Sequence, residues 1–373
     1  MDTRQDLKKA KRLVVKVGSS VICEKDAVSQ GRLRALAGQF GQLNRRGYET
    51  IIVSSGAVAA GFRKLGLHCR PTTLKLKQVC AAAGQVSLMI AWEKALGAFD
   101  LKCAQILLTA DDFSDRSRFL NARNTFISLV EMGVVPIVNE NDTVAVEELK
   151  VGDNDTLGSM VANLTEADLF INLTDLDGLY DSDPRKNKSA KLFLEVPKVD
   201  KNVLNLAGTD GGPLGTGGMF TKVRAAGRLA DRGLASLIAN GHTRDVLIRI
   251  MAGEELGTFF KPSKKTRKAR KHWLAFAARP KGSIIVDQGA ALALVERGKS
   301  LLPGGIVDIV GLFDVGDPVS IADRTGTNIG VGLTNYSSPE IKLIKGHTSK
   351  YIEKTLGYSH SEEVIHRDNL VIF

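Results

Sequence analysis

The stretch RLVVKVGSS, residues 12–20, decides the fold of this chain. Its first part is apolar and largely β-branched apart from Arg12 and Lys16, which predicts a buried strand over 12–17. Gly18 and the two serines after it favour a turn. Similar strands alternate with helical patterns as far as residue 240, so the sequence predicts an α/β fold, a mostly parallel sheet sandwiched by helices. The other strands are expected at 49–54, 103–108, 134–138, 169–173 and 235–239, and the helices at 33–43, 74–95, 117–132, 155–164 and from about 218.

The sequence pattern changes beyond Lys271. Short strand candidates, separated by Gly- and Asp-rich turns, follow one another closely, with one helical stretch at 290–297. This pattern is typical of a small β-barrel-like domain. We therefore expect a first domain over 1–260, a basic linker over 261–278 and a second domain over 279–373. The strands expected in the second domain lie at 282–286, 307–310, 318–322 and 328–332.

Composition excludes several classes of protein. Of the 373 residues, 43% are hydrophobic and 25% are charged, which is the balance of a folded globular chain. No apolar run is long enough to cross a membrane, and the charged N-terminus does not resemble a signal peptide, so we expect a soluble, cytoplasmic protein. The formal net charge is +10, and much of the excess lies in 261–271. That segment is either a solvated linker or an attractor of polyanions.

Several familiar sites are missing from the sequence. The four cysteines show no CxxC spacing and the six histidines form no HxxxH cluster, so we expect no metal held by these side chains. No GxxxxGK[ST] motif occurs and no GxGxxG follows the first strand, which argues against P-loop and dinucleotide-binding folds. Ser54 and Ser55 do not lie in the GxSxG elbow of hydrolases.

The loops that follow the predicted strands are the candidate binding loops, because ligands of parallel sheets bind at the carboxyl ends of strands. Lys16 lies in an apolar strand, where an ammonium is costly to bury unless it meets an anion. Ser55 precedes a helix whose first amides suit a carboxylate or phosphate. Taken singly, each loop is also compatible with an ordinary turn, and Lys16 with an edge strand. The other loops are NEND (139–142) and GDND (152–155), whose carboxylates and amides suit an α-amino acid, TDLDGLY (174–180), and GTGGMFTK (215–222), whose glycines and lysine suit phosphates.

Six motifs together resemble the glutamate 5-kinases, a group within the amino acid kinase family. They occur in the order and spacing of that group: VVKVGSS (14–20), VSSGAVAAG (53–61), VNENDTV (138–144), VGDNDTLG (151–158), LTDLDGLY (173–180) and GTGGMFTK (215–222). The C-terminal part is similar to the PUA domain of many bacterial members, including VDQGA (286–290) and VIHRD (364–368). The resemblance covers essentially the whole chain. It implies an amino acid kinase domain over 1–260 and a PUA domain over 279–373.

The resemblance also implies roles for individual residues. Lys16 and Lys222 are similar to the lysines that contact the transferring phosphates, and Asp155 to the carboxylate that organises them. The glutamate-binding positions of the group match Ser55, Asp142 and Asn154. The nucleotide-binding positions match Lys16, Thr174, Asp175, Thr216, Gly217, Gly218, Met219, Phe220, Thr221 and Lys222. Phe220 departs from the small residue that some relatives carry there, which would change the packing beside the nucleotide.

The activity implied is the ATP- and Mg²⁺-dependent phosphorylation of the γ-carboxylate of L-glutamate to L-glutamyl 5-phosphate. This is the first step of proline biosynthesis, so the resemblance further implies handover to glutamyl phosphate reductase, feedback inhibition by proline and a homo-oligomer. Two alternatives stay open. Another member of the family, acting on aspartate, acetylglutamate or uridylate, would use the same phosphate machinery, and the PUA domain could make the chain an RNA-binding protein.

Overall fold

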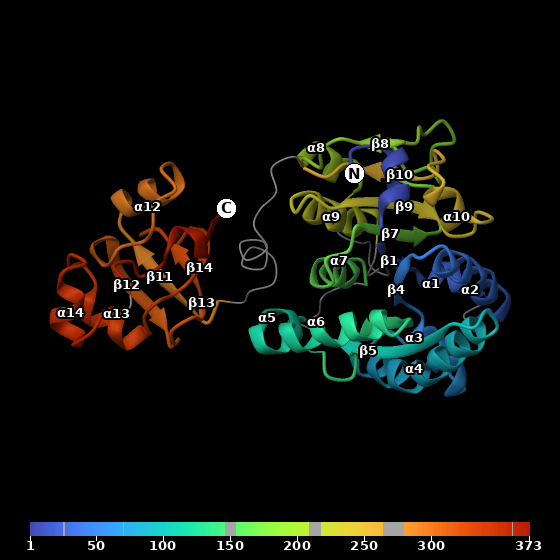
Figure 1. The fold of residues 1–373 in the computed structure, drawn as a ribbon, viewed down its shortest axis with the longest axis horizontal. Coiled ribbons are helices and arrows are strands. Elements are labelled where there is room, and N and C mark those ends of the chain that lie inside the picture. Colours follow the sequence, from blue (N-terminus) through green and yellow to red (C-terminus); the bar gives the residue numbers. More distant parts are fainter. Residues whose placement is uncertain (25–26, 70, 146–153, 209–217, 264–279, 360) are drawn as a thin grey trace. The chain divides into compact units, whose positions relative to one another are not determined.

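The computed structural model describes residues 1–24, 27–69, 71–145, 154–208, 218–263, 280–359 and 361–373. The chain divides into two compact units, Met1–Thr266 and Arg267–Phe373, which are described separately (Figure 1). Within the described ranges, no helix is both long and apolar enough to span a membrane. The domain boundaries expected at 260 and 279 stay predictions, since residues 264–279 lie outside the described part.

The first unit is built on an eight-stranded sheet in the order β5-β6-β4-β1-β7-β9-β10-β8. The strands from β5 to β9 in that order run parallel, and β10 then turns antiparallel to β9. The predicted, mostly parallel sheet is thereby confirmed. The strands are β1 (Arg12–Val17), β4 (Glu49–Ser54), β5 (Lys102–Leu108), β6 (Val134–Glu140), β7 (Leu169–Thr174), β8 (Glu195–Val196), β9 (Ala235–Asn240) and β10 (Thr258–Phe260), with a small hairpin of β2 (Cys23–Glu24) and β3 (Ala27–Val28).

Helices fill the connections between these strands. Gly47, with φ at 86°, follows α2 in the left-handed region that commonly ends helices. The short elements α8, α10, β8 and β10 were not predicted, because six residues or fewer carry too little periodic signal. The helices are η1 (Arg4–Lys9), α1 (Ser19–Ile22), α2 (Gln30–Arg45), α3 (Ala57–Lys64), α4 (Leu74–Gly97), α5 (Ala110–Ser114), α6 (Arg116–Glu131), α7 (Asn154–Leu164), α8 (Lys201–Leu206), α9 (Met219–Ala230) and α10 (Val246–Met251).

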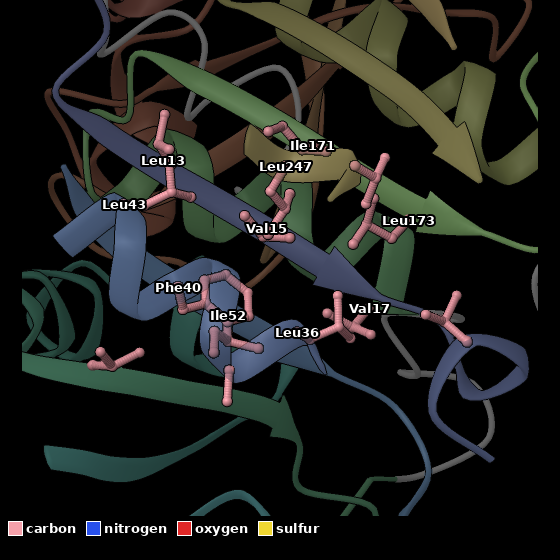
Figure 2. Close-up of a cluster of buried hydrophobic side chains, with 14 of the residues drawn as sticks. Leu13, Val15, Val17, Leu36, Phe40, Leu43, Ile52, Ile171, Leu173 and Leu247 are labelled. Carbon is pink, nitrogen blue, oxygen red and sulfur yellow. The ribbon is translucent and has the colours of Figure 1, made fainter. Parts of the chain in front are cut away.

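The alternation of side chains along β1 explains both its burial and the position of its lysine. Leu13, Val15 and Val17 point to the face that α2 covers with Leu36 and Phe40 (Figure 2). Each such side chain contributes roughly 1.5–3 kcal/mol when fully buried. Residues between them point to the opposite face, under α7. One strand therefore supplies apolar side chains to the core on one face and a lysine to the other face.

The second unit has its own sheet, in the order β12-β11-β13-β14-β15. Its core includes Ile284, Val319, Ile321 and Tyr336, all fully buried. The strands predicted here are all present, whereas β15 was not predicted because it has three residues. The elements are β11 (Gly282–Val286), α12 (Gln288–Val295), η3 (Pro303–Gly305), β12 (Ile306–Gly311), β13 (Pro318–Ala322), β14 (Asn328–Leu333), α13 (Ser338–Ile344), α14 (Tyr351–Leu356), η4 (Arg367–Asn369) and β15 (Leu370–Ile372).

Candidate active site

The parallel strands of the first unit end at one edge of the sheet. In register, Val17 of β1 lies beside Ser54 of β4 and Leu173 of β7. Thr174 at the end of β7 lies beside Asn240 of β9. The loops that follow these strands therefore open along a common edge, as the sequence predicts for a ligand site.

Asp155, in the first turn of α7, binds two lysines from different elements. Lys16 Nζ lies 2.7 Å from Asp155 Oδ1, and Lys222 Nζ lies 3.0 Å from Oδ2. Asp155 is completely buried, and the two lysines are 6% and 5% exposed. The three side chains carry a formal net charge of +1 in a nearly buried place. Such an arrangement is stabilised by the arrival of an anion.

Neutral groups complete the surroundings of the Asp155 carboxylate. Asn172 Nδ2 donates to Oδ1 at 2.9 Å, and Thr221 Oγ1 approaches Oδ2 at 2.7 Å. Burial alone would raise the pKa of Asp155, but the charges of Lys16 and Lys222, with hydrogen bonds from Lys16 and Thr221, outweigh it and hold this pKa below its usual range. Asp155 is therefore ionised at neutral pH and keeps both ammonium groups in place.

Close packing sets the distance between α7 and the sheet. A Cβ atom on Gly158 would come within 2.7 Å of Cε2 of Phe170 on β7, and within 3.5 Å of Lys16 Cβ. Only glycine permits this approach, and it brings Asp155, one turn earlier, to the lysine of β1. On the other side, Gly218 is the N-cap of α9, and Lys222 follows in the first turns of that helix.

A second group of polar side chains lies at the ends of β4 and β6. Asn154 Nδ2 donates to Ser55 Oγ at 2.7 Å and to Asn139 Oδ1 at 3.0 Å, with Ser54 O more distant at 3.5 Å. Asn139 Nδ2 in turn donates to Gln85 Oε1 of α4 at 2.9 Å. Two predicted site residues, Ser55 and Asn154, are thus in direct contact. Asp142 lies two residues beyond the end of β6 and is half-buried.

The end of β7 and the loop after it hold two further predicted residues, Thr174 and Asp175, whereas Met219 and Phe220 lie in the first turn of α9. Thr174 Oγ1 donates to Asp175 Oδ1 at 3.1 Å, and Asp175 Oδ2 forms an ion pair with Arg185 at 2.7 Å. Burial raises the pKa of Asp175, but hydrogen bonds from its own backbone and Thr174 and the charges of Arg185 and Lys222 lower it overall. Thr216 and Gly217 lie outside the described residues.

Sequence reasoning did not single out Asn172, Gln85 or Arg185. Asn172 had a usable signal, because it is a polar residue in an apolar strand and lies beside Lys16 in the register of β1 and β7. Asn139 was part of a predicted loop but had no assigned role. Gln85 carried no signal, because its contact with Asn139 joins segments far apart in the chain.

The same residues bear on whether the chain itself holds a metal ion. Among the described residues, no group of three or more His, Cys, Asp or Glu side chains could hold one. Both oxygens of Asp155 face ammonium groups. The described side chains therefore offer no all-protein cage for a divalent cation.

The chain is similar to known proteins along nearly its whole length. A family model described as "Amino acid kinase family" matches residues 11–240, and one described as "PUA domain" matches residues 282–356. The chain is 49% identical over 367 residues to a protein of Geobacter sp. (strain M21) named "Glutamate 5-kinase", covering 98% of both chains. A protein of the same name from Caldanaerobacter subterraneus subsp. tengcongensis is 49% identical over 97% of both chains.

Solved structures resemble the first unit in fold. A carbamate kinase from Giardia lamblia, bound to AMP-PNP, superposes with a TM-score of 0.50 at 16% identity. The match covers 69% of this chain and 100% of that structure. At this level of identity the likeness concerns the fold alone, and it places the sheet of the first unit among folds of that type.

Proposed function

Because the chain belongs to the amino acid kinase family and, within it, to the glutamate 5-kinases, we propose that it transfers the γ-phosphoryl group of ATP to the γ-carboxylate of L-glutamate. The observation that carries this proposal is the buried cluster of Lys16, Asp155 and Lys222 at the carboxyl edge of the sheet. Its formal charge of +1 is suited to a phosphoryl group that gains negative charge during transfer.

In the proposed reaction, one γ-carboxylate oxygen of glutamate attacks the γ-phosphorus of ATP while the bond from phosphorus to the bridging oxygen breaks. ADP leaves with the electron pair of that bond, and the product is L-glutamyl 5-phosphate. The carboxylate is ionised at neutral pH, so no general base is needed. The protein has to place the two substrates in line and to neutralise charge. Lys16 and Lys222 supply this charge from two different elements, with Asp155 holding them in place.

The proposed glutamate site is the group formed by Ser55, Asn154 and Asp142. Asn154 Nδ2 donates to Ser55 Oγ and Asn139 Oδ1, and no described residue donates a hydrogen bond to its Oδ1. Ser55 Oγ accepts from Asn154, which leaves its own proton to donate. An acceptor and a donor side by side suit the ammonium and carboxylate groups of an α-amino acid. Asp142 adds a carboxylate for the ammonium.

The proposed nucleotide site extends from Thr174 and Asp175 to the beginning of α9. Amide groups in the first turn of a helix favour phosphate oxygens, and a Cβ atom on Gly218, the N-cap of α9, would meet no described atom within 4 Å. Met219, Phe220 and Thr221, in the first turn of α9, belong to the same proposed site, as do Thr216 and Gly217, which lie outside the described residues. Mg²⁺, held by phosphate oxygens and water, would supply further neutralisation of charge on the phosphates.

The test is a coupled assay for ADP release that depends on glutamate. We expect release with L-glutamate and ATP, and none above background with aspartate, acetylglutamate, carbamate or uridylate. The full-length relatives named glutamate 5-kinase favour this substrate over those of the rest of the family. A clear preference for any of the other acceptors would overturn the proposed specificity while leaving the phosphate machinery in place.

The place of the reaction in metabolism follows from its product. An acyl phosphate is prone to hydrolysis and cyclisation, which favours prompt consumption by a glutamyl phosphate reductase as the next step of proline biosynthesis. Feedback inhibition by proline, a homo-oligomeric state and a cytoplasmic location belong to the same proposal. Adding proline to the assay, and measuring the mass of the protein in solution, tests the first two. RNA binding by the PUA domain stays a separate prediction.

A further inference from the structure

Gln85 has a role in the site that its position on α4 does not suggest. It is nine-tenths buried, with 9% of its surface exposed. Its Oε1 accepts a hydrogen bond from Asn139 Nδ2 at 2.9 Å. Within the described residues its Nε2 has no hydrogen-bond partner, although it is buried. An unpaired buried donor costs roughly 1–3 kcal/mol, so a purely structural role does not explain this arrangement.

The contacts of Gln85 continue directly to the proposed glutamate site. Asn139 Oδ1 accepts from Asn154 Nδ2 at 3.0 Å, and the same Nδ2 donates to Ser55 Oγ at 2.7 Å. Four side chains from α4, β6, α7 and the loop after β4 thus form one chain of hydrogen bonds. It passes over the carboxyl edge of the sheet, from the face that α4 covers to the beginning of α7.

A chain of primary amides has a direction. Each amide here donates with its nitrogen to the oxygen of the next, in the order Asn154, Asn139, Gln85. Reversing the direction would turn Asn154 around, so that its nitrogen rather than its oxygen would be left for a ligand. The group that Asn154 presents to the amino acid therefore depends on the direction of the whole chain. This direction requires that Gln85, where the chain ends, keep its oxygen and not its nitrogen toward Asn139.

We propose that Gln85 is a positioning residue that fixes the amide of Asn154, through Asn139, with its oxygen toward the α-ammonium of glutamate. This inference rests on the proposed function of the site. Gln85 does not touch the transferred phosphoryl group and lies on a different element from the lysines. Its effect is therefore expected on glutamate binding and not on ATP binding.

The test compares Gln85→Met, which keeps the volume of the side chain and removes the acceptor, with Gln85→Glu, which keeps an acceptor at the same place. We expect Gln85→Met to raise the KM for glutamate by about tenfold, with the KM for ATP changed less than twofold. We expect Gln85→Glu to restore the KM for glutamate to within about threefold of the wild type. The KM values of the wild type and of both variants are measured on the full chain, and the melting temperature is recorded for each variant.

Gln39 provides a matched control for the loss of a buried glutamine. It is 6% exposed, accepts from Leu247 N at 2.9 Å and lies on α2. Gln39→Met is expected to lower the melting temperature without changing the KM for glutamate.

Asn139→Ala removes the middle of the hydrogen-bonded chain, so it is expected to reproduce the effect of Gln85→Met. The double variant of Gln85→Met and Asn139→Ala is expected to be no worse than either single variant. This pair keeps the proposal testable if Gln85→Met does not fold.

Two results would overturn the proposal. An unchanged KM for glutamate in both Gln85→Met and Asn139→Ala would show that the amide chain does not position Asn154. An equal loss in Gln85→Glu and Gln85→Met would show that packing, and not the acceptor, is what matters at this position. A wild-type protein that neither binds nor turns over glutamate would be a different failure, since it would refute the proposed function and this inference with it.

Discussion

Lys16 Nζ lies 2.7 Å from Asp155 Oδ1, and both side chains are almost completely removed from solvent. The pair joins β1, which lies between β4 and β7 in the sheet, to the first turn of α7, the helix that carries Asn154. Lys222 binds the other oxygen of the same carboxylate at 3.0 Å. A single carboxylate thus places two cations where the proposed phosphoryl transfer takes place, beside the proposed glutamate site.

The first prediction concerns the two lysines. Lys16→Ala and Lys222→Ala are each expected to lower kcat by about 10²–10³, because removing one preorganised contact to developing charge has an effect of this size. Single-turnover and steady-state assays measure it. Lys94→Ala, which removes an exposed lysine of α4, is the control and is expected to keep full activity. Near-normal turnover in both site variants would refute the roles proposed for these lysines.

The second prediction concerns stability and pH. Because the pKa of Asp155 is lowered in the folded protein, ionised Asp155 stabilises the fold above its ordinary, unfolded pKa of about 3.9, and this contribution is lost as pH falls toward the folded value. Asp155→Asn leaves two buried ammonium groups without their carboxylate, so it is expected to lower the free energy of unfolding by about 3–5 kcal/mol at pH 7.

Urea unfolding of the wild type and Asp155→Asn, measured from pH 7 downward, tests the direction in which the contribution of Asp155 to stability changes with pH. The difference between the two proteins is expected to be constant above about pH 5 and to shrink below about pH 4. A difference that grows as the pH falls would contradict the lowered pKa. A difference near zero at pH 7 would contradict the energetic role of the buried cluster.

The third prediction separates the two halves of the site. Asp142→Ala and Asn154→Ala are expected to raise the KM for glutamate by tenfold or more, with a smaller effect on the KM for ATP, because both belong to the proposed glutamate site and the side chain of Asn154 donates to Ser55 and Asn139. Steady-state kinetics with each substrate varied in turn decide the matter. Should ATP saturation suffer more than glutamate saturation, the assignment of the two half-sites is wrong.

The fourth prediction tests the close approach of α7 to the sheet. Gly158→Ala places a Cβ atom 2.7 Å from Phe170 Cε2, so α7 or the ring has to move. We expect a loss of about 1–3 kcal/mol in stability and a lower kcat, because Asp155 moves away from Lys16. Phe170→Leu in the same chain is expected to recover part of both losses. A Gly158→Ala protein with normal stability and kcat would show that this contact is not needed.

Much of this architecture could be predicted from the sequence, because most of its longer strands and helices are specified by their own residues. The strand at 12–17 is specified by its own residues, and its bounds agree with β1 (Arg12–Val17). Lys16 was conspicuous because an ammonium in an apolar strand is costly. The short strands β8 and β10, at one end of the sheet, could not be predicted, because they are ordered by their pairing with each other and with β9 and not by their own pattern.

In the candidate site, too, features set by local sequence could be predicted, and features set by tertiary packing could not. Ser55, Asn154 and Asp155 lie in motifs with a recognisable order, so their neighbourhood at the end of the sheet was predictable. The individual hydrogen bonds between these side chains could not be predicted. The hydrogen bond between Asn139 and Gln85 depends on how α4 packs over β6, and no local pattern in α4 reports it.

The last prediction concerns the independence of the two units. The predicted site residues that are described all belong to the first unit, and the second unit has a sheet and a core of its own. Ser263 N donates to Ala230 O at 2.8 Å, which ties the end of the described part of the first unit back to α9. A chain that ends after Ser263 is therefore expected to fold and to phosphorylate glutamate with a kcat within about threefold of the full chain.

The losses in the shortened chain are expected instead in inhibition by proline, in assembly or in binding to a polyanion. Filter binding of RNA to both chains at several salt concentrations tests the last of these, because contacts to phosphates weaken steeply with salt. A shortened chain that is folded but releases no ADP would show that the second unit helps to build the active site.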